Sequence, residues 1–561
     1  MISQGVDVAA AYPGATVTRA VLGGAGSGPE KTARPAVADA SSGRSLTYGE
    51  LAARTGAAAA GLVREGIRPG DVVGLHLPGG PEFALALHAV TAAGAVPFPV
   101  GGLSAAETAR LLESAGARTV ITWPGLADDV RGQEWRLFCF GEEPGTEPFS
   151  ALLTGAAAPT APVDPARDSG HAEPGTEPFS ALLTGAAASE APVGPGRDPG
   201  AAEAGTEPFS ARSTGVAAPV VPVDPARDLA LIVCAGGPPG PGRTVRLTHA
   251  EMVAALVRVA EAGMIGAADT VLTALPLTGV LGLNGVLNPG LRLGATIVAF
   301  TGGRHDLLRA LQRWRATVAV LPPSLAEALG RDRTVGRYDL RTLRAVVTVG
   351  GPLAAEDARA AAARLGCPVR QAYGLAEAAG ITHLNLRAAE EGTLDSVGRG
   401  LPGVKWCVVH PRTGAGQPSY QPGELCVRLP VARTAAVPVR WLPTGDSAFA
   451  DDHGRVFVLG RVGRARPEPP GEPEAVLAAH PAVSDAAVAP VPDEDLGLAP
   501  HAFAVVTDET SADDLLAYLD THVAGRRGVV AVHLVEEIPR DPGGRVRRRA
   551  LLDRAGLGRL P

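Results

Sequence analysis

Lysine is almost missing from this chain of 561 residues. Lys31 and Lys405 are its only lysines, so arginine supplies nearly all of the 51 basic residues. An arginine side chain stays protonated at neutral pH and cannot act as a base or a Schiff-base amine, as a lysine can. Outside these two positions, a site that a lysine would serve must therefore rely on arginine as a fixed positive charge.

Cysteine is also scarce, and its spacing carries no signature of a metal site. The chain has 5 cysteines without a CxxC pair, namely Cys139, Cys234, Cys367, Cys407 and Cys426. Scattered cysteines of this kind favour buried free thiols in a reducing compartment over disulfides or metal ligands. We therefore expect a cytoplasmic protein.

Long apolar runs and targeting signals are missing from the sequence as well. The first residues include neither a basic region nor an apolar stretch, so no signal peptide is predicted. No run of about 18 apolar residues occurs without charge, Pro or Gly, which argues against a membrane span. The net charge of −7 argues against a general nucleic-acid-binding protein.

Strands and helices alternate along most of the chain. Residues 71–77, 96–100 and 119–122 are predicted strands, and residues 81–93 form a predicted helix. A further helix begins after Thr47, where Glu50 completes a capping box. The alternation predicts an α/β fold in which a large N-terminal domain, residues 1–459, contains parallel-rich sheets covered on both faces.

Residues 460–561 are predicted to form a smaller α+β domain. Helical patterns at 474–480 and 512–523 alternate with strand-like segments at 483–491 and 501–506. A Pro-rich stretch, residues 467–473, predicts an exposed linker or loop at the start of this domain.

A tandem repeat occupies residues 145–228. The sequence Gly-Thr-Glu-Pro-Phe-Ser-Ala begins at Gly145, Gly175 and Gly205, a period of 30 residues. Two leucines per unit are too few for a stacked solenoid, and the third copy replaces them with Arg212 and Ser213. We expect a duplicated surface connector that is looped out and largely disordered. A binding role is the alternative.

Short motifs in a fixed order suggest a family. They are Leu46-Thr-Tyr-Gly-Glu-Leu51, Gly70-Asp-Val-Val73, Tyr373-Gly-Leu-Ala-Glu377, Gly423-Glu-Leu-Cys-Val-Arg428, Thr444-Gly-Asp446, Gly460-Arg461 and Pro539-Arg-Asp-Pro-Gly-Gly-Arg545. With them the chain resembles the adenylate-forming superfamily, in particular its coumarate–CoA ligase-like and medium-chain acyl-CoA ligase branch. The resemblance implies ATP, Mg²⁺ and coenzyme A as cofactors and a small C-terminal domain that is mobile.

The segment that corresponds to the family's phosphate loop is altered. Gly237 and Gly240 keep a glycine-rich turn whose backbone could cradle phosphate oxygens. Arg243 stands where the resemblance expects a lysine, and Pro238 and Pro239 replace hydroxyl residues. Proline also lacks an N–H donor, so the turn offers fewer hydrogen bonds to a triphosphate.

The resemblance assigns the adenosine contacts to three separate segments. Tyr373 would stack on adenine, and Gly350-Gly351 would form the turn that packs along it. Asp446 would accept both ribose hydroxyls, and Arg461 would contact ribose and phosphate. A core aromatic is the alternative interpretation of Tyr373, and a solvated surface pair is that of Asp446 and Arg461.

The remaining contacts concern the metal and the reacting phosphate. Glu377 would hold Mg²⁺, a hard cation that prefers carboxylate and phosphate oxygens. Arg545 stands where the family places a catalytic lysine on the carboxylate and α-phosphate. Ala376 replaces a threonine of the family pattern, and the loop after Arg464 is shortened where the family leads a pantetheine thiol to the site.

These features leave three hypotheses. The first is an AMP-forming ligase that joins a small carboxylic acid to coenzyme A or to an acyl carrier protein, with an impaired rate. The second is a non-catalytic relative that keeps the fold as a binding or scaffold protein. The third is an enzyme that forms an acyl-adenylate but no thioester. Small or apolar residues around 282–288, 349–352 and 378–382 predict a pocket for an aromatic or medium-chain acid.

Overall fold

The structure is a computed structural model. It describes residues 14–23, 32–131, 134–154, 221–235, 243–386, 393–429, 441–462, 472–493, 497–507, 509–522, 529–539 and 548–557. The structural statements that follow concern these residues.

The largest sheet has nine strands in the order β16-β15-β14-β13-β12-β10-β11-β1-β2. The six neighbouring strands β14, β13, β12, β10, β11 and β1 pair in parallel. Strand β2 pairs antiparallel at one edge, and β15 and β16 pair antiparallel at the other. Short strands rich in Val, Ile, Leu and Ala are buried on both faces, as a covered parallel sheet requires. The bounds are β1 (Pro35–Asp39), β2 (Ser45–Thr47), β10 (Thr270–Thr273), β11 (Thr296–Ala299), β12 (Val318–Leu321), β13 (Ala345–Thr348), β14 (Val369–Leu375), β15 (Gly380–Leu384) and β16 (Arg399–Gly400).

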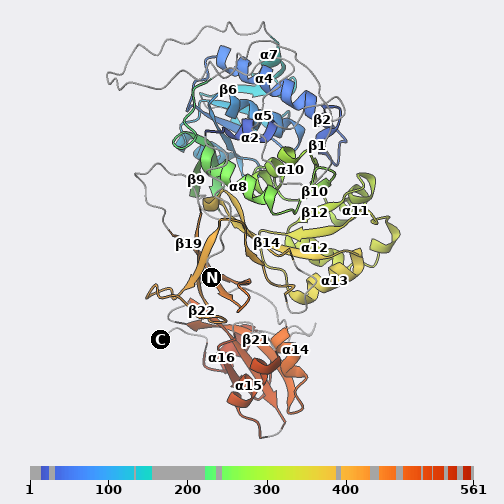
Figure 1. Ribbon diagram of the computed structural model, residues 1–561, viewed down its shortest axis with the longest axis vertical. Coiled ribbons are helices and arrows are strands. Elements are labelled where there is room, and N and C mark those ends of the chain that lie inside the picture. The colour runs from blue at the N-terminus through green and yellow to red at the C-terminus, as the bar shows by residue number, and fades with distance from the viewer. Residues whose placement is uncertain are drawn as a thin grey trace, which may run out of the picture.

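A second, fully parallel sheet has the order β4-β3-β5-β6-β7. Its strands are β3 (Val72–His76), β4 (Val96–Pro99), β5 (Thr119–Thr122), β6 (Arg136–Cys139) and β7 (Glu147–Pro148). The predicted strands and the predicted helix of this region are confirmed, as is the capping box of Thr47 and Glu50. The α/β fold with parallel-rich sheets is therefore confirmed (Figure 1).

The helices pack on these two sheets and contribute to an apolar core shared between them. They are α2 (Val17–Leu22), α4 (Tyr48–Arg64), α5 (Pro81–Ala92), α6 (Ala105–Ser114), α7 (Ser150–Leu153), α8 (His249–Glu261), α9 (Val280–Gly282), α10 (Asn288–Leu293), α11 (Arg304–Arg313), α12 (Pro323–Arg331) and α13 (Ala355–Leu365), with short turns η1 (Ala127–Val130), η3 (Leu283–Leu287), η4 (Val335–Arg337) and η5 (Ala376–Ala378).

Two antiparallel units complete the large domain. β17 (Lys405–Val409), β18 (Gly423–Arg428), β19 (Leu442–Ala450) and β20 (Val456–Arg461) form a four-stranded sheet. β8 (Leu229–Ala235) and β9 (Arg243–Thr248) form a hairpin. β20 extends through Arg461, so the expected boundary after residue 459 falls inside a strand of the large domain.

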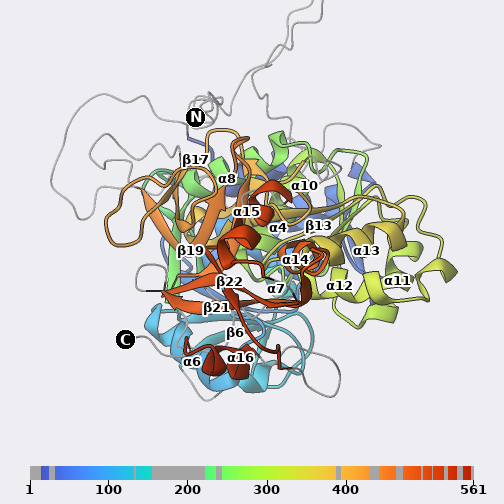
Figure 2. The ribbon, with the colours of Figure 1, turned by 90° about the horizontal axis from the view of Figure 1, so that it is seen from below.

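The small domain is α+β, as predicted. It contains α14 (Glu472–Ala478), β21 (Val483–Asp493), β22 (Gly497–Val506), α15 (Ala512–His522), β23 (Ala531–Leu534) and α16 (Arg548–Arg554), with the three strands in one sheet. It has its own apolar clusters, built around Leu477, Leu515 and Phe503, and lies at one end of the molecule (Figures 1 and 2).

The first repeat copy differs from the expectation of a looped-out connector. Its residues 145–154 form β7 and α7, and Phe149 and Leu152 are each only 1% exposed. The prediction is wrong for this copy because its two apolar side chains reach the core of the large domain. Residues 155–220, which hold the second copy and most of the third, lie outside the described residues.

Two further expectations concern thiols and membranes. All five cysteines are free, and each is buried or half-buried. Among the helices in the described stretches, none has both the length and the apolar character needed to cross a bilayer.

Candidate nucleotide site

Three residues predicted from separate motifs meet at one point of the large domain. Tyr373 lies on β14, Asp446 on β19 and Arg461 at the end of β20. The Tyr373 hydroxyl donates to Oδ2 of Asp446 at 2.5 Å, and Nη1 of Arg461 donates to Oδ1 at 3.0 Å. The structure therefore brings the three side chains into direct contact, while their role in binding adenosine stays a prediction.

The position of Asp446 follows from the local backbone. Asp446 stands opposite Arg461 in the antiparallel β19–β20 register. The preceding Gly445 has φ +70°, a left-handed conformation that favours glycine, and its N–H donates to Oε1 of Glu424 at 2.9 Å. The Thr444 hydroxyl accepts from the Asp446 N–H at 3.1 Å and donates to the Leu425 carbonyl at 2.8 Å. These hydrogen bonds fix the turn at Thr444–Asp446 and with it the position of the Asp446 carboxylate.

The Tyr373 ring is fixed by aromatic neighbours. His383 on β15 lies edge-on to it with ring centroids 5.9 Å apart, and Trp406 lies edge-on to His383 at the same centroid distance. Burial raises the pKa of Tyr373, and the neighbouring Asp446 carboxylate raises it further, so the hydroxyl remains a donor. Sequence reasoning missed His383; a histidine inside the apolar segment of β15 was the signal that could have found it.

The glycine pair predicted to pack along adenine lies next to this cluster. Gly350 and Gly351 follow β13, which pairs in parallel with β14 up to Thr348 and Gln371. Gly350 and Tyr373 each come two residues after those partners, at the carboxyl edge of the sheet. Gly350 has φ +95°, so a side chain there would strain the turn. Ligands of open α/β sheets bind at this edge.

The predicted metal and phosphate residues are only partly described. Glu377 lies in η5, directly after β14, and is half-buried. The β8 and β9 strands both contact η5, so the hairpin whose tip is the predicted phosphate loop extends from beside Glu377. Arg243 begins β9 opposite Ala235, but its side chain, Gly237, Gly240 and Arg545 lie outside what the structure describes.

The segments predicted to line an acyl pocket come together beside this site. The Asn284 amide donates to the Ala379 carbonyl at 2.8 Å. A Cβ atom on Gly285 would lie 3.0 Å from Cδ1 of Ile381, and one on Gly350 would lie 3.9 Å from Leu281. Glycine at 285 thus permits close packing of η3 on β15. Two of the predicted segments, 282–288 and 378–382, are thus in contact, and Gly350 of the third lies near Leu281, directly before the first.

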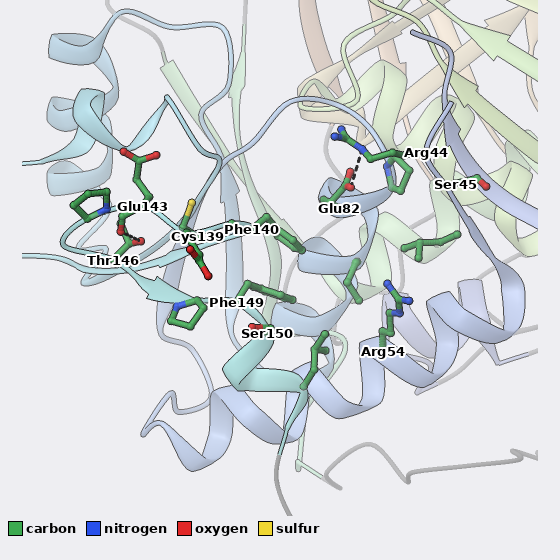
Figure 3. A pocket seen from close by; sticks show the side chains of 18 residues that line it. Arg44, Ser45, Arg54, Glu82, Cys139, Phe140, Glu143, Thr146, Phe149 and Ser150 are labelled. Atoms are coloured by element: carbon green, nitrogen blue, oxygen red, sulfur yellow. Dashed lines mark hydrogen bonds and ion pairs between the residues drawn. The ribbon is translucent and has the colours of Figure 1, made fainter. Parts of the chain in front are cut away.

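A cavity of about 1030 Å³ lies elsewhere in the molecule (Figure 3). Arg44 and Arg54, the start of α5, and the first repeat copy line it. Arg44 pairs with Glu82 at 3.2 Å at its edge. None of the residues predicted to contact nucleotide belongs to its lining.

His249, just after the hairpin, has a structural role. It is 1% exposed, and its Nδ1 accepts from the Val17 N–H at 3.1 Å. Burial lowers its pKa to about 4, so it remains neutral.

The fold is α/β with a small C-terminal domain, and the candidate site lies at the carboxyl edge of β13 and β14. The model of the AMP-binding enzyme family matches residues 27–434, and the model of the AMP-binding enzyme C-terminal domain matches residues 472–545. The first of these spans well over half of the chain. The chain belongs to the AMP-binding enzyme family.

Named relatives and a solved structure agree with this assignment. The chain is 28% identical to 4-coumarate–CoA ligase 3 of Arabidopsis thaliana, covering 92% of this chain and 88% of that protein. It is 30% identical to 4-coumarate–CoA ligase-like 9 of Oryza sativa subsp. japonica, covering 96% and 93%. A benzoate CoA ligase from Burkholderia xenovorans LB400 has the same fold, with a TM-score of 0.60, 20% identity and coverage of 96% and 99%. The resemblance to coumarate–CoA ligases is therefore confirmed, and the protein is a ligase-family enzyme.

Proposed function

We propose that the protein activates a carboxylic acid with Mg-ATP and transfers the acyl group to a thiol. In the first step a carboxylate oxygen attacks the α-phosphorus of ATP and pyrophosphate leaves; in the second, the thiol attacks the acyl-adenylate and AMP leaves. The observation that carries the proposal is the cluster of Tyr373, Asp446 and Arg461 beside the Gly350 turn. Family membership supports the same reaction class.

The cluster suits an adenosine moiety. A carboxylate offers about four acceptor sites, and Asp446 uses one for Tyr373 and one for Arg461, so it can still accept two ribose hydroxyls. The Asp446 side chain is 15% exposed, and that of Arg461 is 61% exposed. Arg461 can therefore hold the carboxylate and still reach toward ribose or phosphate.

The triphosphate end would be held by fewer groups than the family pattern provides. Glu377 is the residue we assign to Mg²⁺, and Arg243 and Arg545 supply positive charge in place of lysines. Mg²⁺ would neutralise phosphate charge and orient the leaving pyrophosphate. Ala376, which is 8% exposed, has no hydroxyl for the phosphate. We therefore propose a slower reaction than the intact pattern would give.

The acid is proposed to be small and aromatic or of medium chain length. The segments beside the site are apolar, with Gly285 against Ile381 and Leu281 beside Gly350. The relatives named for 4-coumarate support an aromatic acid in particular. Coenzyme A is the first candidate for the thiol, and an acyl carrier protein is the second.

ATP–pyrophosphate exchange over a panel of aromatic and medium-chain acids tests the proposal. We expect exchange that depends on both the acid and Mg²⁺, followed by thioester formation when coenzyme A is added. Exchange without a thioester would select an acyl-adenylate-forming enzyme. No exchange with any acid, together with no binding of Mg-ATP, would overturn the enzymatic proposal in favour of a binding or scaffold protein.

A further inference from the structure

Two of the three repeat copies begin with the same sequence. Residues 143–158 and 173–188 are identical at all 16 positions. The third copy keeps the phenylalanine, Phe209, but carries Arg212 and Ser213 where the first has Leu152 and Leu153. We call residues 143–154 the first head and residues 173–184 the second head.

The first head is held by two of its glutamates. Arg136 on β6 donates from Nε and Nη2 to the two carboxylate oxygens of Glu147, at 2.6 and 2.7 Å. This bidentate contact lowers the pKa of Glu147. Nη2 of Arg131 donates to Oε1 of Glu143 at 3.1 Å. The second head has glutamate at both corresponding positions, Glu173 and Glu177.

Apolar contacts hold the other side of the first head. The ring of Phe149 stacks on that of Phe140 with centroids 4.0 Å apart, and Figure 3 shows the two rings side by side. A Cβ atom on Gly61 of α4 would lie 2.7 Å from Cα of Leu152, so the head packs directly on the helix backbone. We call the surface formed by Gly61, Arg136 and Phe140 the head slot.

The chain leaves the head slot at Thr154 and re-enters the described structure at Val221, and both points lie near the segment that follows α4. Nη2 of Arg64 donates to the Thr154 carbonyl at 3.2 Å, where the described part of the first copy ends. On the return, Val221 lies against Gly94, which also neighbours Pro69. Arg64 and Pro69 are five residues apart, which limits their Cα separation to roughly 18 Å.

We propose that the second head is an alternative occupant of the head slot. Every side chain that anchors the first head has an identical counterpart in the second, including Phe179 and Leu182. The third copy does not qualify, because Arg212 would place a charge where Leu152 is 1% exposed. The structure therefore contains one slot, and the sequence supplies two matching heads for it.

The entropic cost of closing the connecting loops determines which head occupies the head slot more often. With the first head bound, one loop of 66 residues joins Thr154 to Val221. With the second head bound, two loops of 30 and 36 residues must close. The dependence of closure on loop length favours the first head by a factor on the order of 10². The second head is thus a reserve that takes the slot when the first head is disabled.

Crosslinking distinguishes the two occupants in the full-length chain. Leu152→Arg gives the first head the residue of the third copy. In this background, Arg64→Cys and Thr184→Cys should be joined within one molecule by a short bis-maleimide, as identified by mass spectrometry. Arg64→Cys with Thr154→Cys in the otherwise unchanged chain sets the reference yield. No link to position 184 would overturn the proposal, and so would a link that forms only between two molecules.

Thermal unfolding supplies the second test. We expect Leu182→Arg alone to leave the apparent Tm within about 1 °C, and the double variant Leu152→Arg/Leu182→Arg to melt several degrees below Leu152→Arg. The matched control is Ala151→Arg with Ala181→Arg, since Ala151 is exposed on α7. If the double variant melts at the same temperature as Leu152→Arg, the second head gives no rescue and the proposal fails.

Discussion

Arginine in place of lysine is the residue-level feature that most affects the proposed chemistry. Arg545 is the residue that we propose in the place of the family's catalytic lysine, and it keeps the positive charge. A guanidinium is larger, planar and always protonated, so it cannot match the reach of an ammonium group. The change should lower the rate of adenylation more than the affinity for the adenosine end of ATP.

Restoring the lysine tests this directly. We expect Arg545→Lys to raise the acid-dependent exchange rate, by up to about 10², because removal of one well-placed electrostatic contact typically costs that much. The KM for ATP should change little. Arg359→Lys on the exposed face of α13 is the matched control. An unchanged rate in Arg545→Lys would contradict the assignment of residue 545.

Tyr373→Phe tests the hydroxyl contact separately from the ring. The substitution removes the donor to Asp446 but keeps the aromatic surface, so we expect the KM for ATP to rise about 10-fold with a smaller change in kcat. Tyr338→Phe, at a partly buried tyrosine outside the site, serves as the control. Equal kinetics for Tyr373→Phe and the unchanged enzyme would show that the hydroxyl does not orient the carboxylate during binding.

The sequence predicted much of the site but not what braces it. Tyr373, Asp446 and Arg461 could be found because each stands in a short motif of a known family. His383 and Glu424 were missed, because their roles depend on strand pairing that brings β15 beside β14 and β18 beside β19. Arg243 and Arg545 stay predictions, since their side chains are not described.

At the level of elements, three histidines on different helices and strands are buried and neutral. His88 on α5, His249 on α8 and His383 on β15 are almost fully buried. Burial lowers their pKa values to about 4, 4 and 3. In each case the folded state resists protonation that the unfolded chain accepts near pH 6.5.

This difference predicts acid sensitivity. Because the pKa of each group is depressed in the folded state, its contribution to stability is present above about pH 6.5 and is lost as the pH falls toward 4 and then 3. Well below pH 6.5, each histidine should cost about 1.4 kcal/mol of unfolding free energy per pH unit. Denaturant titrations between pH 7 and 5 measure the slope, with the exposed His305→Asn as a control that preserves it. A flat profile would contradict the burial of these rings.

Element prediction succeeded where the apolar pattern was local and failed where it was not. The capping box at Thr47 and the strands β3 to β5 follow from neighbouring residues. The first repeat copy was misjudged because its short apolar segment is stabilised by Gly61, which is distant in sequence, and by Phe140, which lies just before the repeat. Such packing leaves no periodic signal in the repeat itself.

For the whole molecule, the two domains have separate cores. The apolar clusters of the small domain use residues from 476 onward, and those of the large domain use residues up to 458. The cluster of Tyr373, Asp446 and Arg461 lies entirely in the large domain, whereas Arg545 belongs to the C-terminal part of the chain. Binding and catalysis should therefore be separable.

A chain that ends after Val462 tests this separation. We expect it to fold and to bind Mg-ATP with a Kd within about 3-fold of the full chain, because Tyr373, Asp446 and Arg461 are retained. Acid-dependent exchange should be lost with Arg545. Circular dichroism confirms folding, and calorimetry gives the Kd. A folded truncation that still catalyses exchange would show that the small domain is not needed for adenylation.

The central claim is that Asp446, held between Tyr373 and Arg461, receives the ribose of ATP. Calorimetric titration of Mg-ATP into the full-length protein and into Asp446→Ala is its most direct test, with the exposed Asp452→Asn as control. We predict saturable binding that Asp446→Ala weakens about 10²-fold, since two hydrogen bonds to a charged group are lost, and that Asp452→Asn leaves unchanged. Equal affinity of Asp446→Ala and the unchanged protein, or no binding by either, would contradict the account.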